Sequence, residues 1–311
     1  MRSLAERSTL LKYRKGHLKL EDLEGGGGRV APAPGGRIFY VDSVSGSSVN
    51  GGEDTDHPLA TIDQAVSLAA VAATRGDVIA VLPGHAENIA AATSLVSDIA
   101  GLRIVGFGVS RARPVLTWTA TAGTIEMDAA NCTLENLVFF SSVSAVTVGI
   151  NVDAAGCQII GCEFNWDATG DDFARMVDTA SQPRTKILDC DFIAEDTAGC
   201  NEGIFLNDSD DIRIEGNYFY GDFTEGPIDS ETAASTNVKI IGNDIYNSDA
   251  TAGIVIDLTQ ADTGIVADNR CTSLAVGATI LDNAVFNPGS CIDGGGNWLA
   301  RGLDRKAYRV P

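Results

Sequence analysis

Acidic and basic side chains recur through residues 186–239 in a pattern that could bind a cation and move a proton. Five aspartates fall in this stretch: Asp189, Asp191, Asp208, Asp210 and Asp211. Three basic residues are spaced by 27 and 26 residues: Lys186, Arg213 and Lys239. Carboxylates are oxygen ligands for Ca²⁺, and a Lys or Arg beside them could remove a proton from the carbon next to a carboxyl group. The same pattern is typical of exposed strand positions, where bases pair with neighbouring acids and hinder association, and we favour that interpretation.

A loop near the N-terminus offers a second set of oxygen ligands. Residues 43–58 are rich in turn-forming residues. Asp42 precedes the loop, and the ligands within it are Asn50, Glu53, Asp54 and Asp56. Their order does not follow the EF-hand pattern, so we interpret the loop as an ordinary turn that could bind Ca²⁺ but is not built for it.

Histidine, tryptophan and cysteine give no further site. His57 is expected to be a loop residue, and His85, which follows a Pro-Gly turn, is expected on the surface. The three tryptophans are too scattered to form a platform for sugar rings: Trp118, Trp166 and Trp298. The seven cysteines show neither a CxxC pair nor the spacing of a zinc site. We therefore expect buried free thiols in a protein that folds in a reducing cytoplasm.

Charge is distributed unevenly along the chain. The formal net charge is −20, but residues 1–20 carry six basic residues and one acidic residue, a net charge of +5, so the rest carries −25. The residues that we expect to bind a partner are Arg2, Arg7, Lys12, Arg14 and Lys15. This polarity is typical of a basic arm that binds an acidic surface, whereas the acidic body is not expected to bind nucleic acid. The alternative for the arm is an amphipathic helix that packs on its own chain or on a sister subunit.

The N-terminal segment shows no signal for a membrane. The chain has no run of about 18 apolar residues, and the N-terminus lacks the apolar region of a signal peptide. Gly25–Gly28 are expected to form a flexible linker, and residues 29–36, which contain two prolines, a stiffer one. We therefore divide the chain into an arm with its linker (1–36), a main domain (37–300) and a C-terminal tail (301–311).

A short sequence motif, here called the repeated phrase, recurs through the chain after residue 130 and indicates the fold. Aligned on one position, it places there Asn136, Cys162, Cys190, Asn217, Asn243, Asn269 and Asn297. Three residues earlier stand Thr133, Ile159, Ile187, Ile214, Ile240 and Val266, and two residues later stand Val138, Phe164, Phe192, Phe219, Ile245, Cys271 and Leu299. A second phrase, an apolar pair closed by Asp or Asn, recurs at 150–153, 176–178, 204–207, 255–257 and 280–282. A fixed period of 26 to 28 residues with two or three short strands per repeat is typical of a solenoid.

Each repeat is expected to form one turn of a coil. Its strands would pair in parallel with the turns above and below, about 4.8 Å away. The asparagines at the aligned position would then stack and bond to one another, which satisfies amides that would otherwise be buried unpaired. The two cysteines in this column would be small replacements within the stack. We count about nine turns from Gly76 to Leu299.

Two elements are expected to protect the ends of this coil. Strands over 37–43 and 76–84 flank a helix over 61–73, which begins with a capping box of Thr61 and Gln64. The helix could cover the exposed strand edges of the first turn, and residues 298–311 could cover the last turn.

The start of the main domain resembles that of a known group. Residues 40–88 contain YVDSVSGSSVNGGEDTDHPLATIDQAVSLA followed by GDVIAVLPGHAEN. This resembles the opening of the right-handed parallel β-helix proteins of the pectate-lyase-like superfamily. The resemblance implies an all-β, right-handed parallel β-helix solenoid with an N-terminal capping helix and an extended N-terminal arm. The same scaffold carries polysaccharide lyases, hydrolases, adhesins, and phage tail-spike and capsid-decorating proteins, so the fold alone does not determine the function.

The chain departs from the hydrolases of this group. Polygalacturonase-like members imply an Asn-x-Asp, an Asp-Asp pair, a Gly-His-Gly and an Arg-x-Lys on successive turns. The pairs Asp171-Asp172 and Asp210-Asp211 are not followed by Gly-His-Gly, and all three histidines precede the repeats. We therefore assign no catalytic residue and no metal ligand.

These observations favour a non-enzymatic phage virion protein. We expect a capsid-decorating or cement subunit on the virion surface, synthesised in the host cytoplasm and held to capsid or other virion proteins by its basic arm. We expect the protein to form a homo-oligomer, specifically a trimer. A glycan is a further potential partner. The alternatives are a tail-spike adhesin and a polysaccharide lyase or depolymerase that uses Ca²⁺; no other cofactor is expected.

Overall fold

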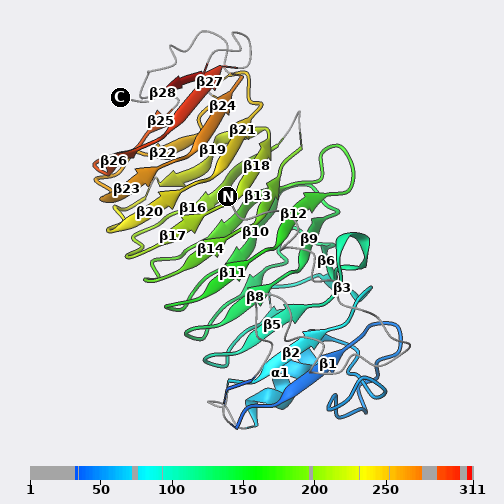
Figure 1. Cartoon of the computed structure of the whole chain (residues 1–311). Helices are drawn as coiled ribbons and strands as arrows, with labels where there is room; N and C mark the ends of the chain where they lie inside the picture. The colour runs from blue at the N-terminus through cyan, green and yellow to red at the C-terminus, as the bar shows by residue number, and fades with distance from the viewer. Residues whose placement is uncertain are drawn as a thin grey trace, which may run out of the picture.

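Three β-sheets run the length of the molecule and wind into one coil (Figure 1). The structure is a computed structural model, and it describes residues 32–33, 35–71, 76–92, 94–195, 199–230, 232–251, 253–274, 286–301 and 307–309. The basic arm, within residues 1–31, lies outside the described residues. In the part of the chain that is described, no helix has the length and apolar character needed to cross a membrane.

The sheets are named A, B and C. Sheet A contains β1 (Ile38–Val41), β2 (Val78–Val81), β5 (Arg103–Gly106), β8 (Thr133–Glu135), β11 (Gln158–Ile160), β14 (Lys186–Leu188), β17 (Arg213–Glu215), β20 (Val238–Ile241), β23 (Gly264–Ala267) and β26 (Ile292–Gly295). Sheet B contains β3 (Ala86–Ile89), β6 (Val115–Trp118), β9 (Val138–Ser141), β12 (Glu163–Trp166), β15 (Asp191–Ile193), β18 (Tyr218–Gly221), β21 (Asp244–Asn247), β24 (Arg270–Ser273), β27 (Trp298–Arg301) and β28 (Ala307–Arg309). Sheet C contains β4 (Leu95–Val96), β7 (Ile125–Glu126), β10 (Val146–Asn151), β13 (Phe173–Asp178), β16 (Cys200–Phe205), β19 (Phe223–Ser230), β22 (Ile256–Leu258) and β25 (Phe286–Asn287). In the described part of the chain, the helices are α1 (Ile62–Ala70) and the 3-10 turn η3 (Ser110–Ala112).

Each turn of the coil contributes one strand to each sheet, in the order A, B, C. The strands from β2 to β25 make eight complete turns, and β26 and β27 begin a ninth. Strands of successive turns pair in parallel along all three sheets, as β11 does with β8 and β14. The structure is thus the all-β, right-handed parallel β-helix that the sequence predicts.

Like side chains stack on like inside the coil. Along sheet A, Ile187 pairs in register with Ile214. Along sheet B, the ring centroid of Phe192 lies 4.8 Å from that of Phe164 and 4.7 Å from that of Phe219, with both ring pairs nearly parallel. These residues are buried. The two apolar columns read from the repeated phrase are therefore confirmed, and they form much of the core.

A ladder of asparagine side chains closes the corner between sheets A and B. The Nδ2 atom of Asn217 donates to Oδ1 of Asn243 at 3.0 Å, and Nδ2 of Asn243 donates to Oδ1 of Asn269 at 2.9 Å. The next step, from Asn269 to Asn297, measures 3.0 Å. Each Oδ1 also accepts a backbone N–H of the preceding turn, as Asn243 does from Asn217 N at 3.0 Å. The predicted stack is confirmed, and it satisfies amides that are cut off from water.

The first copy of the repeated phrase was aligned wrongly by one residue. Leu137, not Asn136, stands at the position of Cys162, because Val138 pairs with Glu163. The residue before this position has a positive φ at every turn: Asn136, Gly161, Asp189, Gly216, Gly242, Asp268 and Gly296. Asn, Asp and Gly tolerate this left-handed conformation, so Asn136 forms the turn and does not join the ladder. Leu134 and Phe139 therefore take the buried places predicted for Thr133 and Val138.

Helix α1 packs at the N-terminal end of the coil, against β1, β2 and β4 (Figure 1). Thr61 accepts a hydrogen bond from Gln64 N at 3.3 Å, and the predicted capping box is present. The helix buries one apolar stripe: Ile62, Ala65, Val66 and Ala69. A hydrophobic face of this size fixes the helix over the first turn, as predicted. The predicted helical residues 72–73 lie outside the described part of the chain.

At the other end of the coil, the chain reverses direction. Strand β28 pairs with β27 in the antiparallel sense, with Leu299 opposite Tyr308. The edge of sheet B is therefore covered by the C-terminal segment, in agreement with the prediction for residues 298–311.

The cysteines also follow the prediction. All seven are free thiols, and all but Cys291 are buried. Cys162 and Cys190 stand on adjacent turns at the position that the asparagines occupy later, as Cys190 N donates to Oδ1 of Asn217 at 2.9 Å. They behave as small apolar side chains in the stack.

Asn243→Ala is expected to destabilise the protein strongly. The substitution removes the acceptor of Asn217 N and the donor to Ile214 O, both of which are buried. Leaving such groups unpaired costs about 2–4 kcal/mol of unfolding free energy in total, which urea denaturation would measure. The matched control is Asn201→Ala at an exposed position, expected to change stability by less than about 0.5 kcal/mol. Equal effects of the two substitutions would contradict a stabilising ladder.

Candidate functional site

The basic column predicted on one face is present, and two of its three members, Arg213 and Lys239, contact acids. Lys186, Arg213 and Lys239 stand in register on β14, β17 and β20 of sheet A. The Nζ atom of Lys239 lies 2.9 Å from Oδ1 of Asp211, and Arg213 pairs with Glu215. The column is therefore a set of charge pairs on an exposed sheet face, which is the interpretation that we favoured.

The five aspartates near this column do not form a cluster. Asp189, Asp208 and Asp211 have positive φ values and occupy corners of the coil. The hydrogen bond from Lys239 is the main cause that lowers the pKa of Asp211. Asp191 lies on β15 of sheet B, and Asp210 accepts a hydrogen bond from the Thr236 hydroxyl. Among the described residues, the carboxylates that gather closely enough to share a cation are elsewhere, on sheet C.

The loop before α1 uses its oxygen atoms to build turns. Oδ1 of Asp42 accepts from Val44 N at 3.0 Å, and Oδ1 of Asp54 accepts from His57 N at 2.8 Å. The amide of Asn50 donates to Pro58 O at 2.8 Å. Because these side chains bond within the loop, it has the ordinary turn structure that we expected.

His85 was predicted on the surface, and this prediction is wrong. Its side chain is buried, with 0% exposed. Its Nε2 lies 3.0 Å from Oε2 of Glu87, and that oxygen also accepts from Ile62 N, in the first turn of α1, at 2.9 Å. The Glu87 carboxylate therefore links the buried histidine to the first turn of helix α1. His85 therefore belongs to the attachment of the cap.

The outer face of sheet C carries acidic residues on successive turns. Asn151 of β10 stands in register between Glu126 of β7 and Asp178 of β13. Farther along the same sheet, Asp229 pairs with Asp257. Parallel in-register pairing places Asp229 about one strand spacing from Asp257, whereas Asn151 separates Glu126 from Asp178.

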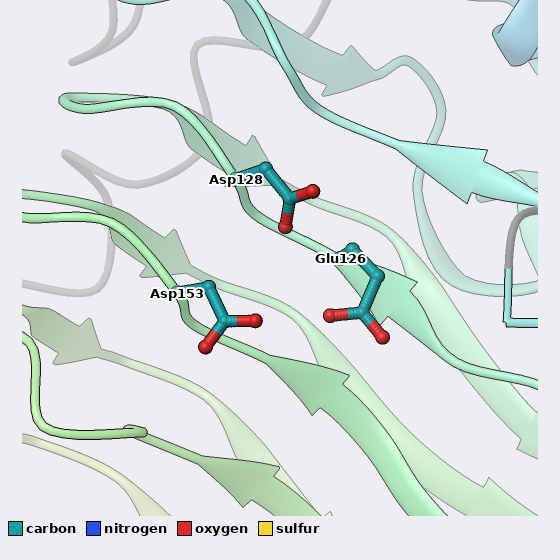
Figure 2. Close-up of side chains that lie close together, drawn as sticks. All are labelled: Glu126, Asp128 and Asp153. Atoms are coloured by element: carbon teal, nitrogen blue, oxygen red, sulfur yellow. The ribbon is translucent and has the colours of Figure 1, made fainter.

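Three carboxylates at the start of this face form a compact group. Glu126 and Asp128 lie on one turn and Asp153 on the next, and Figure 2 shows their side chains around a common space. One carboxylate oxygen of each lies within 4.8 Å of those of the other two. The Asn151 amide joins them, donating to Glu126 at 3.0 Å and to Asp153 at 2.8 Å.

The charges of this group are only partly neutralised. Partial burial, followed by the charges of Asp153 and Asp128, raises the pKa of Glu126 against the opposing effect of the Asn151 hydrogen bond. Burial also raises the pKa of Asp153, with contributions from Asp128 and Asp178. Three carboxylates on two turns are suited to a hard divalent cation such as Ca²⁺. These are the residues that could hold the metal.

Arg175 lies near this group and organises a second set of side chains. Its Nη1 is 3.3 Å from Oδ2 of Asp178, and its Nε is 3.3 Å from Oε2 of Glu202. The guanidinium lies 3.6 Å above the ring of Phe205. Burial, followed by a hydrogen bond with Glu225, raises the pKa of Glu202 to about 8, although Arg175 opposes the shift. The Glu202 carboxyl group therefore holds a proton at neutral pH.

The sequence did not identify this face, although it contained a signal. Asp153 and Asp178 each close a copy of the second phrase, which we read as a structural repeat. The structure places Asp178 opposite Asn151 and not opposite Asp153, so the copies are offset by two residues. An acidic residue that recurs at the end of a strand predicts a column of charged side chains along the sheet. The register of strand pairing, which the structure provides, is needed to tell which acidic residues are neighbours.

Comparisons with known proteins add little to this description. No family model and no curated protein matches the chain. Among solved structures, a rhamnogalacturonan lyase is similar, with a TM-score of 0.46 and 13% sequence identity over 76% of this chain and 69% of that one. The pairing of the strands itself, rather than this match, establishes the parallel β-helix fold that the resemblance to pectate-lyase-like proteins implied.

Deprotonation of Glu202 should lower the free energy of unfolding of the wild-type protein as the pH rises, and Glu202→Gln is expected to abolish this effect. The pKa of Glu202 is raised from 4.5 to about 8 in the folded chain, so the folded state holds a proton that the unfolded chain releases between these values. This contribution to stability is fully present below about pH 4.5 and is lost as the pH rises through about 8. The difference in stability between the variant and the wild type should therefore shift in favour of the variant when the pH is raised from 5 to 9. Urea denaturation midpoints at the two pH values would measure this difference.

The control for this experiment is Glu215→Gln, which removes a partly exposed carboxylate on sheet A. Its effect should be similar at both pH values. A Glu202→Gln difference that is the same at pH 5 and pH 9 would contradict a raised pKa of Glu202.

Proposed function

We propose that this protein is a non-enzymatic structural component of a phage virion, a capsid-decorating or cement subunit attached by its basic arm. The observation that carries the proposal is the charge polarity: residues 1–20 have a net charge of +5 and the rest of the chain has −25. A short basic segment joined by Gly25–Gly28 to a large acidic body is suited to binding an acidic partner while the body remains outside.

The architecture supports this use in two ways. The coil has its own continuous core along the described turns, so it does not need a partner in order to bury its apolar residues. On sheet A, Lys239 pairs with Asp211 and Arg213 pairs with Glu215, whereas the arm concentrates basic residues that could bind elsewhere. A trimeric or other homo-oligomeric subunit on the virion surface is part of the same proposal.

Removal of residues 1–28 is expected to abolish attachment while the coil remains folded. The measurement is co-sedimentation of the purified protein with particles of its phage, with folding checked by circular dichroism and urea denaturation. The finer variant replaces Arg2, Arg7, Lys12, Arg14 and Lys15 with Gln and should weaken attachment in a salt-dependent manner. The control is Lys186→Gln with Lys239→Gln on the coil. Unchanged co-sedimentation without the arm would overturn the proposal.

A Ca²⁺-dependent polysaccharide lyase is the second candidate, and one observation favours it. The group Glu126, Asp128 and Asp153 could hold a cation, and Arg175 lies beyond Asp178 on the same face. A bound Ca²⁺ would bridge the protein to the carboxylates of a uronate polymer, and a basic side chain would remove the proton next to a carboxyl group. A guanidinium group stays protonated in proteins, so Arg175, which contacts Asp178 and Glu202, is poorly suited to accept that proton.

Uronate polymers are expected to remain uncleaved in the presence of Ca²⁺. The measurement is the ultraviolet absorbance of unsaturated products. Product that disappears with EDTA and with Asp153→Asn, or with Arg175→Lys, would overturn the structural role and establish the lyase. Product that disappears when Lys186, Arg213 or Lys239 is changed to Ala would place the reaction on sheet A.

A further inference from the structure

Six carboxylates lie along sheet C, the corner that follows it and helix α1, which packs against β4. Glu126 and Asp178 end strands β7 and β13, and Asp98, Asp128 and Asp153 follow strands β4, β7 and β10. We call this set the acidic strip, and it consists of Asp63, Asp98, Glu126, Asp128, Asp153 and Asp178. The turns that carry it are in register, since Asp128 N donates to Ser97 O at 3.0 Å and Asp153 N donates to Met127 O at 3.2 Å. Four of these side chains are exposed, and Glu126 and Asp178 are half-buried. The strip is therefore open to a partner over its length.

Neighbouring members of the acidic strip repel one another. Burial, with the charges of Glu87 and Asp98, raises the pKa of Asp63. Burial, with the charges of Asp128 and Asp178, raises the pKa of Asp153. Arg175 contacts the strip at its far end, through Asp178 at 3.3 Å. Most of the strip thus carries negative charge that a cationic segment would relieve.

The chain outside the described residues begins at the foot of this same corner. Ala33 N donates to Gly76 O at 3.2 Å, and a β-carbon on Gly76 would lie 2.8 Å from that of Ala33. On the following turns, Gly101 N donates to Ala130 O at 2.9 Å, and Asn131 N donates to Ala155 O at 2.9 Å. Three members of the acidic strip stand close before these corner residues in the chain: Asp98, Asp128 and Asp153.

We propose that residues 1–20 bind the acidic strip of their own chain. The segment brings six basic residues with a net charge of +5 to a strip of six carboxylates. From β4 to β13 the strip crosses three strand spacings, about 14 Å, which a linker of this length reaches easily. Attachment to the same chain gives an effective concentration on the order of millimolar, so binding within the chain prevails over binding to another copy.

This inference does not depend on the virion assignment. It concerns the free protein, in which the arm neutralises the acidic strip until a more acidic or more complementary partner competes for it. Because the contacts are between exposed charges, salt should release the arm. The same carboxylates cannot bind the arm and a divalent cation at the same time, so the two ligands should compete.

The test uses the full-length chain with Tyr13 replaced by the photo-crosslinking residue p-benzoylphenylalanine. Tyr13 lies between Lys12 and Arg14, so it reports the position of the basic cluster. After irradiation at low salt, the monomer is digested and crosslinked peptides are identified by mass spectrometry. We expect crosslinks within one chain to peptides that contain Asp98, Asp128 or Asp153, and their loss in 0.5 M NaCl or with excess Ca²⁺.

A pair of charge reversals provides the matched comparison. Asp128→Lys with Asp153→Lys should lower the yield of these crosslinks about tenfold. Asp191→Lys with Asp244→Lys makes the same change of net charge on the outer face of sheet B and should leave the yield unchanged. Asp128→Asn with Asp153→Asn gives a milder form of the test if the reversals disturb folding.

Crosslinks to sheet A or sheet B, or crosslinks that persist in the Asp128 and Asp153 variants, would overturn the inference. Crosslinks found in a covalent dimer, and not in the monomer, would overturn its intramolecular form. Absence of any crosslink at low salt would also overturn it, because a bound arm must lie within reach of the photoreactive group.

Discussion

The in-register parallel pairing of successive turns is the constraint on which the rest of the structure depends. It places each side chain about 4.8 Å from its counterparts above and below, so a residue is surrounded by copies of its own position. Apolar residues gain from this arrangement, as in the stack of Phe164, Phe192 and Phe219. Polar residues must be able to bond to their own kind, which explains why Asn217 and Asn243 form a ladder. Charged residues cannot be stacked in this way without compensation.

Sheet C shows three ways of compensating for stacked carboxylates. An amide can separate two acids, as Asn151 separates Glu126 from Asp178. A proton can be retained, as on Glu202, whose pKa is raised mainly by burial. A cation can be inserted, as Arg175 is between Asp178 and Glu202. Where none of these suffices, as along the acidic strip, the face keeps an unrelieved charge. The face with the most unrelieved charge is the natural place to look for a ligand of opposite sign.

The sequence predicted those features that depend on one position repeated at a constant interval. The Asn217 to Asn297 ladder, the aromatic column and the capping box at Thr61 follow from local residue types and were all confirmed. The misplacement of Asn136 arose because Asn suits both a ladder and a left-handed turn. His85 was misplaced because its burial depends on how α1 packs, which no local pattern records. The acidic strip was missed because segment lengths between sheets vary, so the sequence alone does not show which acids share a corner.

The reversal of the chain at β28 affects how copies of this protein can meet. Sheet B does not end in a parallel strand: its last strand runs antiparallel to β27. A second molecule that arrived at that end would face a hydrogen-bonding pattern that does not continue the coil, so growth into a filament is discouraged there. The reversal concerns sheet B alone, since β26 and β25, at the same end of sheets A and C, pair in parallel with the turn before them.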